Sequence, residues 1–135
     1  MIERRNIPTG TKLGDVAGYS RAVVVGDLIE ISATGAVDEN GNIVGTDAAT
    51  QARFIFQKIE RVLKEVGSRL EDIVRVRKYI INPSDVDQVS RVNGEFLRNI
   101  KPASSMVIVQ AMPVPGLLIE IEARAIRNSY KVEQK

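Results

Sequence analysis

The chain has 135 residues, 44% of them hydrophobic and 27% charged, which is typical of one globular domain covering residues 1–135. It contains no cysteine and no histidine, so disulfides, zinc fingers, thiolate nucleophiles and imidazole bases are excluded. The net charge is only +2 and no basic run is present. The first residues lack the apolar core of a signal peptide, and no apolar run approaches the roughly 18 residues of a membrane span, so we expect a cytoplasmic protein.

The first half of the chain predicts a hairpin and a helix. Residues 1–18, punctuated by glycines and a proline, predict a short edge strand and a loop. Residues 22–32 hold two β-branched runs around a Gly-Asp turn, which is typical of a hairpin. Apolar residues then recur at helical spacing from Ala52 to Val66, with Thr46 or Asp47 as the cap and Gly67 as the end.

The second half predicts a strand, a helix and two more strands. In the strand 73–81 we expect Val74, Val76 and Ile80 on one face, and on the other Ile73, Arg75, Arg77, Tyr79 and Ile81. A helix begins at Ser84 or Asp85, runs to about Ile100, and has an apolar stripe formed by Val86, Val89, Phe96, Leu97 and Ile100. Asn93 falls on that stripe. Strands are expected at 105–110 and 117–126.

This order of elements predicts an α+β fold with a mixed sheet. Two helices serve five or six strands, so we expect both helices on one face of the sheet. In the last strand Ile119, Ile121, Ala123 and Ala125 should face the core. The opposite face has no cover within the chain, and the Val/Ile-rich strands 22–31 favour a second subunit over solvent there. We therefore expect a homo-oligomer.

Seven short segments, in their order and spacing, resemble one known family: residues 19–23, 25–28, 40–45, 66–74, 92–93, 101–105 and 119–123. The family is the Rid family, also called YjgF/YER057c/UK114 and, in older labels, endoribonuclease L-PSP. The resemblance implies a fold similar to bacillus-type chorismate mutase. It also implies a homotrimer with a central barrel, outer helices and ligand clefts between subunits.

The resemblance further implies hydrolysis of reactive imines and enamines, such as 2-aminoacrylate, without a cofactor. An imine carbon is already electrophilic and needs mainly a positioned water, so the chemistry suits a chain without histidine or cysteine. In the family pattern Tyr19 shapes the cleft, Asn93 supports it, and Glu120 orients the water or shuttles a proton. Tyr19 as a packing aromatic and Asn93 as a structural amide remain alternatives.

One departure from the family pattern concerns the substrate carboxylate. The family clamps it with an arginine in a Pro-Ala-Arg-Ser segment, whereas here Pro102-Ala103 is followed by Ser104 and Ser105, and then by Met106. An arginine fork donates two charge-assisted hydrogen bonds and a serine only one neutral bond. The loss of such a partner costs on the order of 2–5 kcal/mol, so we expect 2-imino acid hydrolysis to be weak or absent.

Several site residues also have a structural interpretation. Glu120 could pair across the sheet with Arg75, Arg77 or Arg124 instead of handling a proton. The hydroxyls of Ser104, Ser105 and Thr34 could line the ligand site or bond the local backbone. Arg21, Arg75 and Arg77 could replace the missing arginine, although ion pairs at a subunit interface are the favoured interpretation.

Three functions remain open at this point. The first is a trimer that binds a small metabolite at its subunit interfaces and hydrolyses imines with altered specificity. The second is a catalytically silent binding or regulatory trimer. A ribonuclease or translation-inhibitor role is less favoured because the net charge is small and aromatics make up 4% of the chain. No phosphate-binding glycine loop or metal-spaced carboxylate cluster is present, so no cofactor or metal is expected. No membrane partner is expected either, and a nucleic-acid partner is disfavoured by the small net charge.

Overall fold

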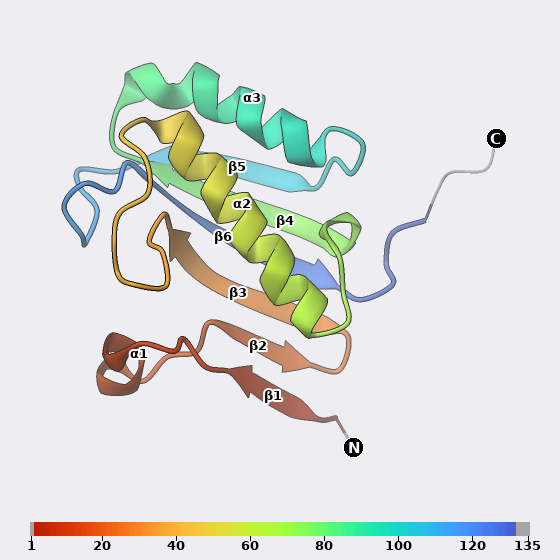
Figure 1. The fold of residues 1–135 in the computed structure, drawn as a ribbon. Helices are drawn as coiled ribbons and strands as arrows, with labels where there is room; N and C mark the ends of the chain where they lie inside the picture. The colour runs from red at the N-terminus through yellow and green to blue at the C-terminus, as the bar shows by residue number, and fades with distance from the viewer. Residues whose placement is uncertain (1, 132–135) are drawn as a thin grey trace.

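The computed structural model describes residues 2–131 and shows one sheet with two long helices packed on one of its faces (Figure 1). The strands are β1 (Arg4–Ile7), β2 (Ala22–Val25), β3 (Leu28–Gly35), β4 (Ile73–Ile80), β5 (Ala103–Ile108) and β6 (Ile119–Ile126). The α-helices are α1 (Lys12–Ala17), α2 (Ala48–Glu65) and α3 (Val86–Leu97), and single 3₁₀ turns lie at Leu70–Asp72 and Pro83–Asp85. Within residues 2–131 no helix is long and apolar enough to cross a membrane.

The strand order β1-β2-β3-β6-β4-β5 confirms the predicted mixed sheet. Among the described strands, β4 and β5 pair in parallel and the other neighbours pair antiparallel. A parallel pair needs a crossover connection, and α3 supplies it between β4 and β5. The edges of the sheet are therefore β1 and β5. Both α2 and α3 lie on one face, as predicted, and the other face is open in the single chain (Figure 1).

The N-terminal third contains the confirmed hairpin and one helix that the sequence analysis missed. The turn between β2 and β3 has Gly26 at φ +58°, a backbone conformation that favours glycine. Residues 12–17, expected as a loop, form α1, whose cap Thr11 accepts a hydrogen bond from the Gly14 N–H. This helix has no buried apolar stripe to predict it, since Leu13 and Val16 are exposed. Gly18, at φ 77°, ends it and leads the chain into Tyr19.

The two long helices follow the predicted pattern with corrections at their ends. Asp47 caps α2 by accepting a 2.7 Å hydrogen bond from the Thr50 N–H, and the predicted apolar stripe is buried. In α3 the stripe is wrong at Val86, which lies at the first helical position and is 40% exposed. Val92 is buried on that helix instead, and the helix ends at Leu97 rather than near Ile100.

Two β-bulges decide which side chains face the helices. Between Ile31 and Thr34, β3 has one residue more than the opposing segment of β6. As a result Thr34 pairs with the core residue Ile121 and is only 1% exposed. A similar shift between Ile73 and Arg75 in β4 puts Ile73 in the core, at 2% exposure. The prediction that Ile73 shares a face with Arg75 is therefore wrong, because simple alternation fails across a bulge.

The core lies between the sheet and helices α2 and α3. The predicted inward residues of β6, Ile119, Ile121, Ala123 and Ala125, are all buried. Their neighbours Glu120, Glu122 and Arg124 lie on the open face, which is half polar as expected. The fold thus leaves one charged face of the sheet available for further contacts.

Candidate functional site

A buried lysine joins two of the predicted site residues. Lys78 lies on the core face of β4 between Val76 and Ile80, and it is only 3% exposed. Its Nζ donates a 2.8 Å hydrogen bond to Asn93 Oδ1 on α3 and a 2.6 Å bond to Ser104 Oγ on β5. Asn93 and Ser104 therefore meet at one point on the helix side of the sheet, at the β5 edge.

The environment of this lysine is apolar. Its cross-strand partners are Ile121 on β6 and Met106 on β5, and neither can be charged. Because burial disfavours the ammonium, the pKa of Lys78 falls from its ordinary 10.5 to about 8. Within residues 2–131, no carboxylate forms an ion pair with Lys78.

The sequence analysis missed Lys78, although the sequence carries a signal for it. A lysine two residues from Val76 and two from Ile80 occupies a core-facing position of an alternating strand. Buried lysines almost always have a polar partner, so such a position predicts neighbouring acceptors. Here Asn93 and Ser104 are those acceptors.

A second group contains the other predicted residues, gathered around Arg21 at the start of β2. Arg21 Nη1 donates a 3.1 Å hydrogen bond to Thr34 Oγ1, and the Thr34 hydroxyl donates to the Ser32 carbonyl at 2.9 Å. Burial lowers the pKa of Arg21, while the nearby groups of Tyr19 and Glu120 oppose that shift. Tyr19 is 42% exposed.

Glu120 is half-buried in this second group, at the start of β6. Loss of solvent raises the pKa of its carboxyl, and the positive charge of Arg21 partly offsets the rise. A half-buried carboxyl with a raised pKa, next to a cation, is a candidate for exchanging protons with a ligand.

The two groups do not converge within one chain. Ser104 lies opposite Val76 on the helix-covered face, whereas Glu120 lies opposite Tyr79 on the open face. Their partners on β4, Val76 and Tyr79, are three residues apart, and β5 and β6 are two strand spacings apart. The two positions are therefore separated by roughly 10 Å along the strands and roughly 10 Å across them. The predicted residues therefore form two half-sites: Asn93 and Ser104 in one, and Tyr19 and Glu120 in the other. Thr34, predicted to line the ligand site, is buried instead, and its hydroxyl bonds Arg21 and the Ser32 carbonyl.

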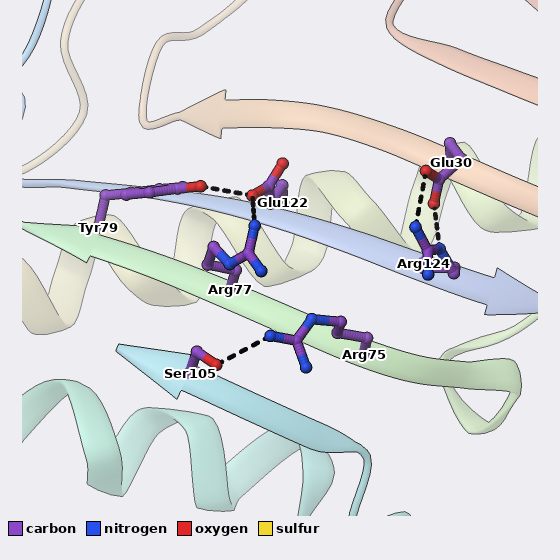
Figure 2. Close-up of polar contacts among 7 residues, drawn as sticks. All are labelled: Glu30, Arg75, Arg77, Tyr79, Ser105, Glu122 and Arg124. Carbon is purple, nitrogen blue, oxygen red and sulfur yellow. Dashed lines mark hydrogen bonds and ion pairs between the residues drawn. The ribbon is translucent and has the colours of Figure 1, made fainter. Parts of the chain in front are cut away.

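Ser105 belongs to neither half-site but to a polar network on the open face. Figure 2 shows this network, with the helices behind the sheet. Arg75 Nη2 donates to Ser105 Oγ at 3.0 Å, and Arg124 Nε to Glu30 Oε1 at 2.6 Å. Glu122 Oε1 accepts bonds from the Tyr79 hydroxyl at 2.5 Å and from Arg77 Nη1 at 3.4 Å, and the bond to Glu122 raises the pKa of Tyr79. The network surrounds a shallow hollow of about 210 Å³.

This network bears on the structural interpretation of Glu120. The arginines proposed as its partners bond elsewhere: Arg77 to Glu122, Arg124 to Glu30 and Arg75 to Ser105. In the described part of the chain Glu120 makes no ion pair within 4.0 Å. Three carboxylates close enough to hold a metal ion are also absent from residues 2–131.

Known proteins match this chain in sequence and in fold. The family model described as Endoribonuclease L-PSP matches residues 9–127. A RutC family protein of Pyrococcus abyssi is 33% identical over 84% of this chain and 89% of its own length. Protein mmf1, mitochondrial, of Schizosaccharomyces pombe is 32% identical over 85% of this chain and 72% of its own.

The crystal structure of Rv2704 from Mycobacterium tuberculosis, described as a member of the YjgF/YER057c/UK114 family, superposes with a TM-score of 0.83 at 36% identity. The match covers 92% of this chain and 99% of that one. The TM-score shows that the fold of this chain agrees with that structure. The chain therefore belongs to the endoribonuclease L-PSP family, that is, the Rid or YjgF/YER057c/UK114 family.

Proposed function

We propose that the protein is a homotrimer whose subunit clefts bind a small metabolite and hydrolyse imines or enamines to a carbonyl compound and ammonia. The observation that carries the proposal is Glu120, a half-buried carboxyl of raised pKa beside Arg21, which Tyr19 also adjoins. Family membership supports the same assignment. The compartment proposed is the cytoplasm, although two relatives from Schizosaccharomyces pombe are named as mitochondrial.

The assembly follows from the separation of the two half-sites. One chain cannot bring Ser104 and Glu120 to the same ligand, because they lie on opposite faces of its sheet. In a trimer the Ser104 half-site of one subunit meets the Glu120 half-site of its neighbour. The apolar side chains of Val107 and Ile108 on the β5 edge, 40% and 51% exposed in the single chain, support burial of that edge by another subunit.

The proposed reaction uses Glu120 as the proton carrier. Water adds to the carbon of the C=N bond, the carboxylate takes up the water proton, and the same proton passes to the nitrogen. Glu120 then takes the proton of the carbinolamine hydroxyl and passes it to the amino nitrogen, and the C–N bond breaks to give the carbonyl compound and ammonia. No nucleophilic side chain is required, because the imine is already the electrophile.

The ligand anchor is the Ser104 half-site, with Lys78 behind the hydroxyl. When Lys78 is an ammonium, its 2.6 Å bond to Ser104 Oγ polarises the O–H toward an acceptor on the ligand. One polarised hydroxyl holds a carboxylate less firmly than an arginine fork does. We therefore propose neutral imines as better substrates than 2-imino acids. Ser105 faces the other side of β5 and is left out of this anchor.

The experiment is an ammonia-release assay on a panel of freshly generated imines with and without a carboxylate. We expect the wild-type protein to accelerate at least one neutral imine, and Glu120→Gln to lose that acceleration. The matched control is Glu39→Gln, an exposed acid in a turn. Ser104→Arg should shift the preference toward 2-imino acids. If no imine reacts faster than in buffer, the enzyme assignment is wrong and a silent binding trimer becomes the better account.

A further inference from the structure

The hydroxyl of Ser104 lies within 2.6 Å of an amine that is itself oriented by a third group. Lys78 Nζ contacts Ser104 Oγ on one side and Asn93 Oδ1, at 2.8 Å, on the other. A nucleophile, a base and a residue that orients the base form the arrangement by which serine is activated in acyl transfer. We infer that Ser104 is a nucleophile toward activated acyl esters, with Lys78 as its general base and Asn93 as the positioning residue.

The hydrogen-bonding capacity of the three groups fits this assignment. A neutral amine has two N–H donors and one lone pair, whereas the Asn93 carbonyl oxygen can only accept. Asn93 therefore takes one N–H of Lys78, and the lone pair remains for the Ser104 O–H. The donor–acceptor distance of 2.6 Å is short enough for proton transfer between Oγ and Nζ.

Exposure separates the roles of the two residues. Ser104 lies on the edge strand β5 and is an exposed residue in the single chain. Lys78 is 3% exposed and cannot itself contact a ligand in solvent. The serine is thus the group that reacts, and the lysine acts from behind it.

The protonation state of Lys78 is set by burial. The same-face neighbours of Lys78 on β4 are Val76 and Ile80, and its cross-strand partners are Ile121 and Met106. Its bonded partners are Asn93 and Ser104, and none of these six side chains carries a charge. With a pKa of about 8, roughly a tenth of the lysine is neutral at pH 7 and about half at pH 8. An ordinary lysine would be almost entirely charged at both values.

The step balances without any co-reactant. Ser104 Oγ forms a bond to the acyl carbon, its proton moves to Lys78 Nζ, and the bond between the acyl carbon and the leaving oxygen breaks. The alkoxide or phenolate departs, and Lys78 returns the proton to it or to solvent. Water, with its proton taken by Lys78, then hydrolyses the acyl-serine to the free acid. This activity shares Ser104 with the proposed imine site but does not rest on imine hydrolysis.

The test uses p-nitrophenyl acetate on the whole protein, with release of p-nitrophenolate as the rate and peptide mass spectrometry to locate the acetyl group. We expect acetylation of Ser104 whose rate rises with pH and levels off above about pH 8, as the Lys78 amine becomes fully neutral. Ser104→Ala should abolish it, and Lys78→Met should slow it by about 100-fold or more.

Two controls make the result specific. Ser105→Ala removes the neighbouring serine, which bonds to Arg75 and not to a lysine, and should leave labelling of Ser104 unchanged. Lys58→Met removes another partly buried lysine, whose Nζ bonds the Val37 carbonyl, and should also change nothing. The inference is overturned if folded Lys78→Met labels as fast as wild type, or if acetyl groups spread evenly over lysines and serines.

If Lys78→Met does not fold, the pH dependence of acetylation in the wild-type protein still tests the inference. A rate at Ser104 that climbs tenfold per pH unit up to pH 10, without levelling, would mean that hydroxide and not Lys78 removes the proton, and would overturn the inference. Failure of the imine assay leaves this outcome unaffected, so the two proposals can fail separately.

Discussion

At the scale of single residues, the pH dependence of hydrolysis should follow Glu120. The carboxyl must be ionised to take the proton of water, and its pKa lies above the ordinary value because it is desolvated. We expect kcat/KM for an imine substrate to rise with pH through that raised pKa. Glu120→Gln should lose this rise with pH and should lower kcat/KM by about 100-fold or more. Steady-state rates from pH 4 to 8 measure this, and a pH-independent wild-type rate would be inconsistent with the role given to Glu120.

Lys78 makes a separate prediction about stability. Its folded pKa of about 8 lies below the ordinary 10.5, so between these values the unfolded chain binds more protons than the folded one. The free energy of unfolding of the wild type should therefore rise, relative to that of Lys78→Met, by roughly 2–4 kcal/mol between pH 8 and 10.5. Urea denaturation at several pH values measures the difference. For the control Lys64→Met, on the exposed side of α2, the free energy of unfolding should change with pH as it does in wild type. The same pH dependence in Lys78→Met as in wild type would show that burial does not lower the pKa of Lys78.

At the scale of elements, Gln51 holds α2 to the start of β6. Its Nε2 donates to the carbonyls of Gly45 and Gly116 at 3.2 and 2.9 Å, and its Oε1 accepts from the Leu118 N–H at 2.8 Å. The side chain is fully buried, and Leu118 is two residues before Glu120. Gln51 therefore positions the strand that carries the proposed proton carrier.

Replacement of Gln51 by methionine keeps the volume but removes these three bonds. We expect Gln51→Met to lower the free energy of unfolding by about 2–4 kcal/mol and to speed hydrogen exchange at the Leu118 amide. Gln57→Met, an exposed position on the same helix, should change neither. Equal stability of the two variants would show that the Gln51 bonds do not hold this segment.

At the scale of the whole molecule, the proposed trimer should depend on the open face and the β5 edge. Val107 pairs with Tyr79 on the open face and is 40% exposed in the single chain. A charge there would be buried without a partner in a trimer but not in a monomer, so Val107→Asp should dissociate the assembly. Sedimentation equilibrium should give three times the 14.9 kDa chain mass for wild type and the chain mass for the variant. The control Val86→Asp changes an equally exposed residue on α3 and should remain trimeric. Dissociation of both variants, or a monomeric wild type, would contradict a trimer built through the open face and the β5 edge.

The sequence predicted the layers of the fold better than the side on which each residue lies. The hairpin, α2 and the core face of β6 followed from periodicity, because simple alternation or helical spacing holds within them. Thr34 and Ile73 did not, since bulges in β3 and β4 shift the alternation by one residue. The helix α1 was missed because it is short and buries no stripe.

For the candidate site, the sequence and its resemblance identified residues but not their grouping. Asn93 and Ser104 could not be paired before the position of Lys78 was known, and that position depends on the parallel pairing of β4 with β5. The absence of the family arginine at Ser104 was visible in the sequence. The ammonium behind Ser104 was visible only as a lysine in a core position, and its two partners come from elements distant in the chain.

The proposed trimer has a shared cleft, in which Glu120 of one subunit and Ser104 of its neighbour act on one ligand. Mixing two variants tests it most directly: Glu120→Ala, which lacks the proton carrier, and Ser104→Leu, which blocks the anchor. After the two are unfolded together and refolded as mixed trimers, about a quarter of the clefts should combine an intact Glu120 with an intact Ser104 across a subunit boundary. We predict that about a quarter of wild-type imine hydrolysis returns, although each variant alone is inactive. A mixture no more active than its two components would contradict the shared cleft.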